Sequence, residues 1–108
     1  MDFADMEMLV MSLIVDAGSA RSFAMESIRL AKEGAAGAAR ESLENGARQM
    51  AKAHETQTDL IRQEAQGNHF EMNLFMVHAQ DHIMTAMLAL DMAREFVGLY
   101  ERLGGGAL

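Results

Sequence analysis

The 108-residue sequence contains no proline, no cysteine and no tryptophan, and aromatic residues make up only 6% of it. Without cysteine the chain can form neither disulfides nor metal sites with thiolate ligands. Without proline, no predicted helix is interrupted by a residue that lacks a backbone N–H. Half of the residues are apolar and 11 are methionine. This composition predicts one compact, helix-rich domain.

Basic residues are also scarce, with nine Lys and Arg against 16 Asp and Glu, for a formal net charge of −7. Nucleic acid is therefore not an expected partner, because phosphates require a basic binding surface. An acidic chain suits a protein partner with a basic docking face.

Long uncharged runs are missing as well. No stretch approaches ~18 consecutive uncharged apolar residues, so we expect no membrane span. The N-terminal residues Met1 to Asp5 begin acidic and lack the basic segment and apolar core of a signal peptide. We therefore expect a cytoplasmic protein.

Apolar residues recur at spacings of three and four, the helical period, along most of the chain. Gly34 and the pair Gly67-Asn68 break this pattern. The predicted helices run from about Asp5 to Glu33, from Ala36 to Ala65 and from Met72 to Leu103. Short connections make neighbouring helices antiparallel, so the fold class is all-α, an up-down-up three-helix bundle. Residues 1–103 form the predicted domain, and 104–108 a flexible tail.

The third predicted helix carries four polar side chains on one face. With ~100° per residue, Asp81, His82 and Thr85 all fall within about 60° of His78. The same arc holds Leu74, Phe75, Leu88, Ala89, Met92, Ala93, Phe96, Leu99, Tyr100 and Leu103. Burying unpaired polar groups costs ~1 to 3 kcal/mol each. The cluster therefore needs either a functional explanation or a buried hydrogen-bond network.

Further apolar residues lie outside the predicted seams. A second stripe on the third helix, roughly opposite His78, comprises Met72, Met76, Ile83, Met87 and Leu90, and Met8, Met11 and Val15 lie off the main seam of the first helix. A helix that is apolar nearly all round must be covered on more than one side, which predicts self-association. The alternative is that methionines fill gaps in a loose core.

The residue types narrow the possible chemistry. The spacing HxxDH could place metal ligands on one helix, but no Glu is placed as the base of a zinc protease. Gly34 to Gly37 lack the Lys and Ser or Thr of a phosphate-binding loop. Histidine remains as a nucleophile, because a neutral imidazole keeps one nitrogen lone pair free to attack. A nearby hydroxyl or second imidazole can orient it.

Two further histidines have simpler interpretations. His54 lies on the predicted apolar seam of the second helix, with Leu43, Ala47, Met50, Thr58 and Ile61, so we expect a hydrogen-bonded core histidine. His69 follows the Gly67-Asn68 break, and we expect it to be solvated.

The segment Met76–Met87 resembles the signature of the lactose/cellobiose class of enzyme IIA components of the bacterial sugar phosphotransferase system. Further similarity lies in Ile14–Ser22, Ala31–Gly34 and Ala53–Ile61, and the resemblance covers roughly residues 6–103. It implies a homotrimer of three-helix bundles. Each chain would accept a phosphoryl group from the histidine-containing phosphocarrier protein and pass it to a cysteine of the IIB component for disaccharide uptake.

The resemblance also implies site roles. His78 matches the phosphorylated histidine, with phosphate on Nε2, while His82, Gln80 and Thr85 match supporting positions. Asp81 matches the carboxylate that meets its two symmetry mates around a divalent metal, commonly magnesium. Three carboxylates ~4 Å apart at an effective dielectric of 20 would repel by ~12 kcal/mol in total. We therefore expect trimer stability to depend on metal or on acid.

Two other hypotheses remain open. One is a metal-binding helical module that uses His78, Asp81 and His82 of a single chain and binds zinc as a monomer. The other is a catalytically silent oligomeric or regulatory bundle in which the polar face only sets the helix register. The sequence does not identify the sugar.

Overall fold

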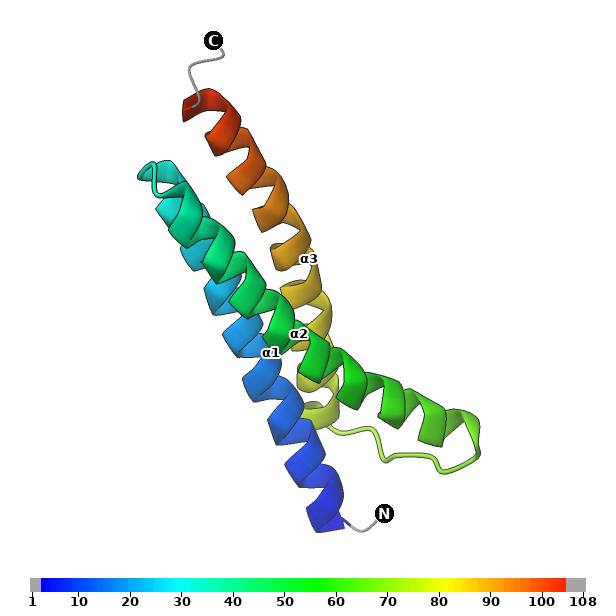
Figure 1. Cartoon of the computed structure of the whole chain (residues 1–108). Coiled ribbons are helices and arrows are strands. Elements are labelled where there is room, and N and C mark those ends of the chain that lie inside the picture. Colours follow the sequence, from blue (N-terminus) through cyan, green and yellow to red (C-terminus); the bar gives the residue numbers. More distant parts are fainter. Residues whose placement is uncertain (1–2, 105–108) are drawn as a thin grey trace.

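The computed structural model describes residues 3–104. They form three helices, α1 (Phe3–Lys32), α2 (Ala36–Ala65) and α3 (Leu74–Gly104), and the two connections between them. Figure 1 shows that α1 and α3 run in the same direction and that α2 runs in the opposite direction. The predicted three-helix bundle is confirmed, with each helix end within two residues of its predicted position. Gly104, expected in the tail, closes α3, and residues 105–108 lie outside the described part.

Glycines end the first two helices. Gly34 has φ +85°, its N–H donates to the carbonyl of Ala31 at 3.0 Å, and the N–H of Ala35 donates to the carbonyl of Leu30 at 2.9 Å. Gly67, with φ +93°, ends α2 with the same pair of bond types. This pattern satisfies the last carbonyls of a helix and needs a residue that adopts positive φ at little cost. The apolar helical pattern is therefore interrupted at Gly34 and Gly67 because the helices end there.

Asn73 sets the start of α3. Its side-chain Oδ1 accepts a hydrogen bond of 2.9 Å from the backbone N–H of Met76, three residues on. An asparagine in this position satisfies one of the unpaired donors at a helix N-terminus. The helix therefore begins at Leu74 rather than at Met72, which lies before the cap with its side chain exposed.

The core lies along α1, which packs against both other helices, whereas α2 and α3 contact each other less. Small side chains permit this close packing. Ala17, Ala20 and Ala24 of α1 are fully buried. At Gly46 of α2 an added Cβ would lie 3.1 Å from Leu90 Cδ1 and 3.3 Å from the Ala20 carbonyl oxygen. The three helices meet at this glycine.

Of the two apolar stripes predicted on α3, the one opposite His78 forms the core seam and the one that contains His78 lies mostly outside. The core seam is spaced by three and four and comprises Met76, Ala79, Ile83, Ala86, Leu90, Ala93 and Val97. The arc that holds His78 is mostly outside, with Leu88 62%, Leu99 51% and Phe96 40% exposed. Within a single chain, the arc that holds His78 is therefore an outer face and not the core seam of α3. The alanines between the larger residues of the core seam let it approach α1 closely. The size of the apolar side chains alone did not show which stripe would be buried.

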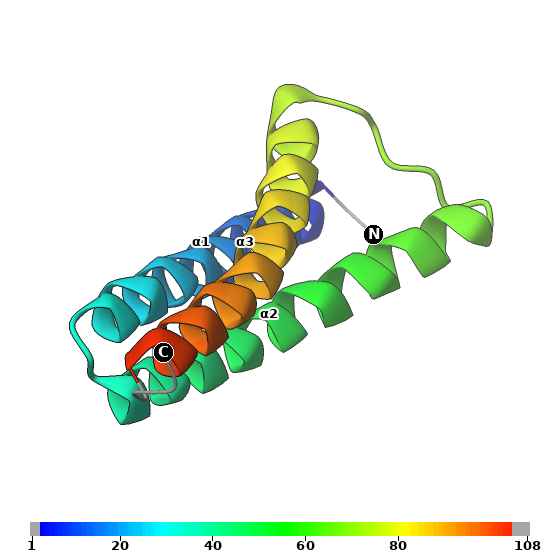
Figure 2. The ribbon, with the colours of Figure 1, turned by 90° about the horizontal axis from the view of Figure 1, so that it is seen from above.

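A similar shift corrects the second helix. Leu43 and Met50 are buried as expected, but His54 is exposed and Ile61 is 60% exposed. The core positions of α2 instead include Ala39, Ser42, Gly46, Ala53 and Leu60. His54 is therefore not a core histidine. Figures 1 and 2 show the reason: the C-terminal half of α2 leans away from α3, and residues 66–73 cross back to it.

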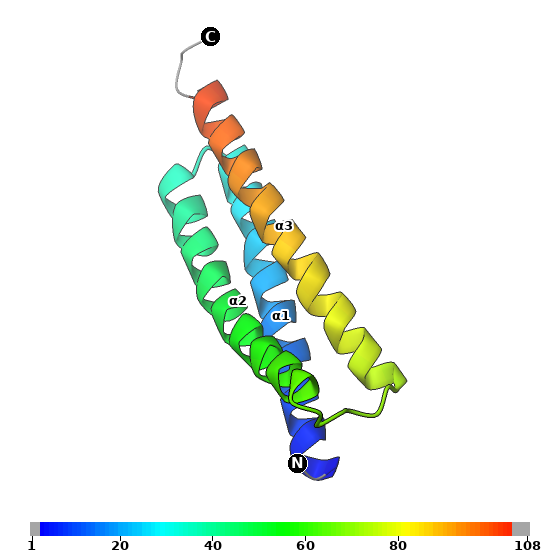
Figure 3. The same ribbon diagram turned by 90° about the vertical axis from the view of Figure 1, so that its right-hand side faces the viewer.

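Among the residues that the structure describes, only α1 has the length and composition of a membrane span. The stretch is Asp5–Lys32, with a mean hydropathy of 1.3 in its most apolar window. The expectation of no span counted only uncharged runs, and this stretch contains charged residues. Packing accounts for part of its apolar character, because Leu13, Ala17, Ala20 and Ala24 are fully buried against the other helices. Figure 3 shows α1 running alongside both α2 and α3.

Candidate functional site

His78, Asp81, His82 and Thr85 lie together on the outer side of α3, as the helical spacing predicts. His78, Asp81 and Thr85 are exposed, and His82 is half-buried. Ala79 and Ile83 on the same two turns are fully buried in the core. Because these anchors fix the rotation of the helix, the backbone presents the four polar groups outward from a rigid scaffold.

The imidazole rings of His78 and His82 are in contact. Their centroids are 4.3 Å apart and their planes are inclined at 82°, an edge-to-face arrangement. This geometry is typical of packed aromatic rings. His82 therefore restricts the rotation of the His78 ring, while the exposed side of His78 stays open to a reacting group.

Thr85 and Asp81 have different surroundings. The Thr85 hydroxyl donates to the backbone carbonyls of Asp81, at 2.8 Å, and His82, at 3.3 Å, so it is engaged within the helix rather than with the His78 ring. The Asp81 carboxylate makes no hydrogen bond or ion pair with the residues that the structure describes. It lies exposed on an otherwise largely apolar face.

Gln80 contacts the second helix. Its Oε1 accepts a hydrogen bond of 2.9 Å from Gln57 Nε2 on α2, and its own Nε2 is 3.6 Å from the sulfur of Met76. Within one chain, Gln80 thus joins α3 to α2. Gln57 was not among the predicted site residues, although it lies in the segment Ala53–Ile61 that carries the family resemblance.

The other histidines do not extend the site. His54 borders a shallow groove of about 200 Å³ between α2 and α3, together with Met87, Asp91 and Arg94. His69 is exposed as expected, and its Nδ1 also contacts the carboxylate of Glu64. Across residues 3–104, no three His, Cys, Asp or Glu side chains gather to hold a metal. A single-chain metal site at His78, Asp81 and His82 is therefore not assembled.

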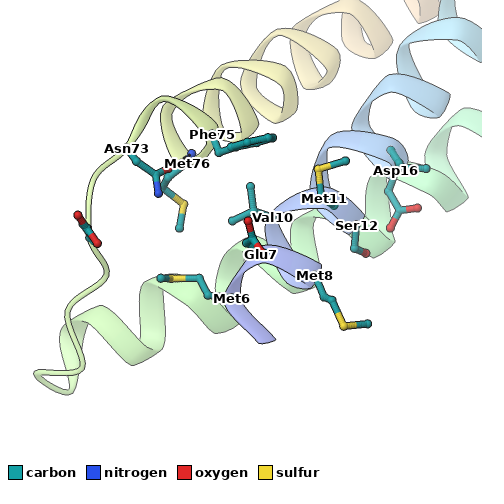
Figure 4. A pocket seen from close by; sticks show the side chains of 12 residues that line it. Met6, Glu7, Met8, Val10, Met11, Ser12, Asp16, Asn73, Phe75 and Met76 are labelled. Carbon is teal, nitrogen blue, oxygen red and sulfur yellow. Dashed lines mark hydrogen bonds between the residues drawn. The ribbon is translucent and has the colours of Figure 1, made fainter. Parts of the chain in front are cut away.

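A larger groove of about 720 Å³ lies between the N-terminal turns of α1 and the start of α3. Figure 4 shows side chains from both helices around it. Its lining is Met6, Glu7, Met8, Val10, Met11, Ser12, Val15, Asp16, Glu71, Asn73, Phe75 and Met76. The apolar residues that lie off the main seam of the first helix, Met8, Met11 and Val15, are all part of it.

The fold and this site define an all-helical bundle that carries, on its last helix, an exposed histidine in contact with a half-buried one. The family described as PTS system, lactose/cellobiose specific IIA subunit, matches residues 8–101. The lichenan-specific phosphotransferase enzyme IIA component of Bacillus subtilis (strain 168) is 48% identical over 99 residues, which are 92% of this chain and 90% of that protein. The chain belongs to this IIA family of the sugar phosphotransferase system.

Solved structures agree in fold. The PTS cellobiose specific enzyme IIA from Bacillus anthracis has a TM-score of 0.91 and 39% sequence identity, covering 98% of this chain and 95% of that one. The IIA(Chitobiose) chain of a IIA–HPr complex from the N,N'-diacetylchitobiose branch of the Escherichia coli phosphotransferase system has a TM-score of 0.77 and 38% identity, covering 90% and 94%. The protein is accordingly a phosphotransferase component of sugar transport.

Proposed function

We propose that the chain accepts a phosphoryl group on His78 from HPr, the histidine-containing phosphocarrier protein, and passes it to a cysteine of a IIB component. The observation that carries this proposal is an exposed imidazole in the second turn of α3, in contact with a second imidazole. A similar IIA chain has been solved in complex with HPr, which supports HPr as the donor.

His78 keeps its Nδ1 proton throughout, and the donor phosphohistidine carries a proton on its second ring nitrogen, so the donor ring leaves as a neutral imidazole. The Nε2 lone pair attacks the phosphorus of the donor phosphohistidine. A P–N bond forms on His78 as the donor's P–N bond breaks, and that electron pair returns to the donor ring. A IIB thiolate then attacks the same phosphorus, an S–P bond forms, and the electron pair returns to Nε2. Such transfer depends on positioning and charge compensation, and the contact with His82 supplies positioning.

The working unit that we propose is a homotrimer. The outer face of α3 leaves large apolar side chains uncovered in one chain, namely Leu88, Met92, Phe96, Leu99 and Leu103, each at least 40% exposed. An apolar stripe of this length is characteristic of an interface. That the assembly contains three chains is taken from the family resemblance. In such a trimer, the face that carries His78 lies at a boundary between chains.

We also propose that three Asp81 carboxylates share one divalent cation, with magnesium as the first candidate, on the axis of this trimer. One observation supports this site: the Asp81 side chain is exposed on the uncovered apolar face and has no partner among the described residues. One chain supplies a single carboxylate, so the site requires three copies. Hard oxygen ligands suit such a cation, which would offset the mutual repulsion of the carboxylates.

Phosphorylation in vitro tests the function. Purified chain is incubated with phosphoenolpyruvate, the first phosphotransferase enzyme and HPr, and intact mass is measured before and after acid treatment. The wild type should gain one acid-labile phosphoryl group per chain. His78→Ala should gain none, while His54→Ala and His69→Ala, which remove other exposed histidines, should be labelled normally.

Labelling of His78→Ala, or no labelling of the wild type, would contradict the assignment. Retention of the phosphoryl group after addition of a IIB component would contradict the second transfer alone.

A further inference from the structure

Two methionine sulfurs of α3 contact side-chain amides. Gln57 Nε2 on α2 donates to the sulfur of Met84 at 3.8 Å. The same nitrogen donates to Gln80 Oε1 at 2.9 Å. Gln80 Nε2 in turn donates to the sulfur of Met76 at 3.6 Å. The four side chains thus form one continuous run of polar contacts between α2 and α3.

Exposure separates the two sulfurs. Met84 is 55% exposed, whereas Met76 is 3% exposed in the core. A thioether that solvent reaches is open to oxidation to a sulfoxide. The chain contains no cysteine, so thioethers are its only sulfur groups. Among the described methionines whose sulfur contacts an amide, Met84 is the one that an oxidant in solution reaches.

The Met84 contact lies where α2 and α3 are weakly joined. These two helices contact each other less than either contacts α1. The C-terminal half of α2, which carries Gln57, leans away from α3 (Figure 2). Apart from the contacts of Gln57, the described side-chain hydrogen bonding between α2 and α3 is that of Arg40 with Glu101, near the opposite end. A change at Met84 therefore acts on a contact that few other bonds reinforce.

Oxidation changes the hydrogen-bonding capacity of Met84. A thioether sulfur is a weak acceptor, whereas the sulfoxide is polar and carries an oxygen on that sulfur. A primary amide has two N–H groups, so Gln57 Nε2 can donate to the new oxygen and keep its bond to Gln80. Because the sulfur already lies 3.8 Å from Nε2, rotation of the Met84 side chain suffices to bring the oxygen to the amide.

We propose that Met84 is a redox modification site, at which a peroxide oxidises the thioether to a sulfoxide that binds Gln57 and tightens the contact between α2 and α3. With hydrogen peroxide, a sulfur lone pair attacks one oxygen, an S–O bond forms and the O–O bond breaks. The departing oxygen keeps the bonding pair, takes the proton from the oxygen bound to sulfur and leaves as water. The sulfur loses two electrons and the peroxide gains them. This site does not depend on phosphoryl transfer.

Met25 on α1 provides a matched comparison. It is 53% exposed, and its sulfur has no hydrogen-bond donor among the described residues. A sulfoxide at this position adds a polar oxygen that only water can bind. The difference between Met84 and Met25 therefore measures the contact with Gln57 rather than oxidation itself.

The first part of the test locates the modification. The full chain is treated with hydrogen peroxide under native conditions, and peptide mapping by mass spectrometry follows each sulfoxide with time. We expect Met84 and Met25 to be oxidised at rates within threefold of each other. Met76 and Met50, which are 3% and 8% exposed, should react at least tenfold more slowly.

The second part measures the new hydrogen bond. Nuclear magnetic resonance follows the side-chain N–H groups of Gln57 before and after oxidation. In the wild type we expect one of these resonances to move downfield and its exchange with solvent to slow at least threefold. Oxidised Met25→Leu should behave in the same way, whereas oxidised Met84→Leu should show neither change. Treatment with the two methionine sulfoxide reductases, one for each epimer, should restore the original spectrum.

Four results would overturn the proposal. Met84 could be oxidised at least tenfold more slowly than Met25, so that peroxide does not reach it. The Gln57 resonances could stay unchanged in the oxidised wild type. They could change equally in oxidised Met84→Leu, which would place the cause at another methionine. Oxidation of Met84 could also speed the exchange of the Gln57 N–H groups, so that the sulfoxide loosens the contact.

Discussion

The imidazole rings of His78 and His82 meet edge to face, with centroids 4.3 Å apart. This contact joins the only two histidines of α3, one helical turn apart. The half-buried ring of His82 supports the exposed ring of His78 on one side. Under the proposed function, this contact assigns His82 the part of a positioning residue.

Replacing His82 should slow phosphoryl acceptance without abolishing it. We expect His82→Ala to lower the transfer rate from HPr by about 10- to 100-fold, since misplacing a reacting group by ~1 Å can cost about 100-fold. His82→Phe, which keeps a ring in contact, should recover much of the loss. Rapid-quench measurement of single-turnover transfer checks this, and a wild-type rate in His82→Ala would contradict the positioning role.

Removing divalent metal should weaken the proposed trimer. At neutral pH we expect EDTA to lower the thermal midpoint of the wild type by roughly 5 °C or more, about 1 kcal/mol for a domain of this size. Asp81→Asn removes the repelling charges, so its midpoint should not respond to EDTA. Differential scanning calorimetry makes the comparison. If neither EDTA nor the Asp81→Asn substitution changes the thermal midpoint relative to the untreated wild type, the axial metal is ruled out.

Charge on the outer face of α3 should dissociate the assembly. Phe96 is 40% exposed in one chain, so Phe96→Glu should fold as a helical bundle yet sediment as a monomer, because burying an unpaired carboxylate at the interface is costly. Ile61→Glu, at a position of α2 that is 60% exposed, is the control and should leave the mass unchanged. A trimeric Phe96→Glu would show that this face is not the interface.

Two glycines should respond in opposite directions to alanine. At Gly46 a new Cβ would lie 3.1 Å from Leu90 and 3.3 Å from a backbone oxygen of α1, so Gly46→Ala should destabilise the chain by about 1 to 3 kcal/mol through overpacking. At Gly18 nothing lies within 4 Å of the new Cβ. Gly18→Ala should therefore stabilise α1 by roughly 0.5 to 1 kcal/mol. Urea unfolding of both variants provides the measurement, and equal effects would contradict the difference in packing.

Helix bounds were predictable because their determinants are local. Gly34 and Gly67 adopt positive φ where the helices end, a requirement that glycine meets at the lowest cost. The start of α3 was placed two residues early because the capping bond from Asn73 to Met76 was not anticipated. An asparagine just before an apolar periodic segment was the available signal.

Burial was less predictable, since it depends on which stripe meets a neighbouring helix. The exposed positions of His54 and Ile61 follow from the lean of α2 away from α3. The resemblance gave Gln80 a supporting role near His78, and within the chain its side chain bonds to Gln57 of α2. No spacing along one helix could reveal a partner on another.

The sequence by itself determined three helices, their ends and the shared face of His78, Asp81, His82 and Thr85, because helical geometry fixes the angle between residues on one element. The tertiary structure decided which apolar stripe of α3 is buried. Alanine-rich positions approach α1 and Gly46 closely, so the small-residue seam packs inside and the histidine face stays outside. That choice leaves the His78 side chain exposed.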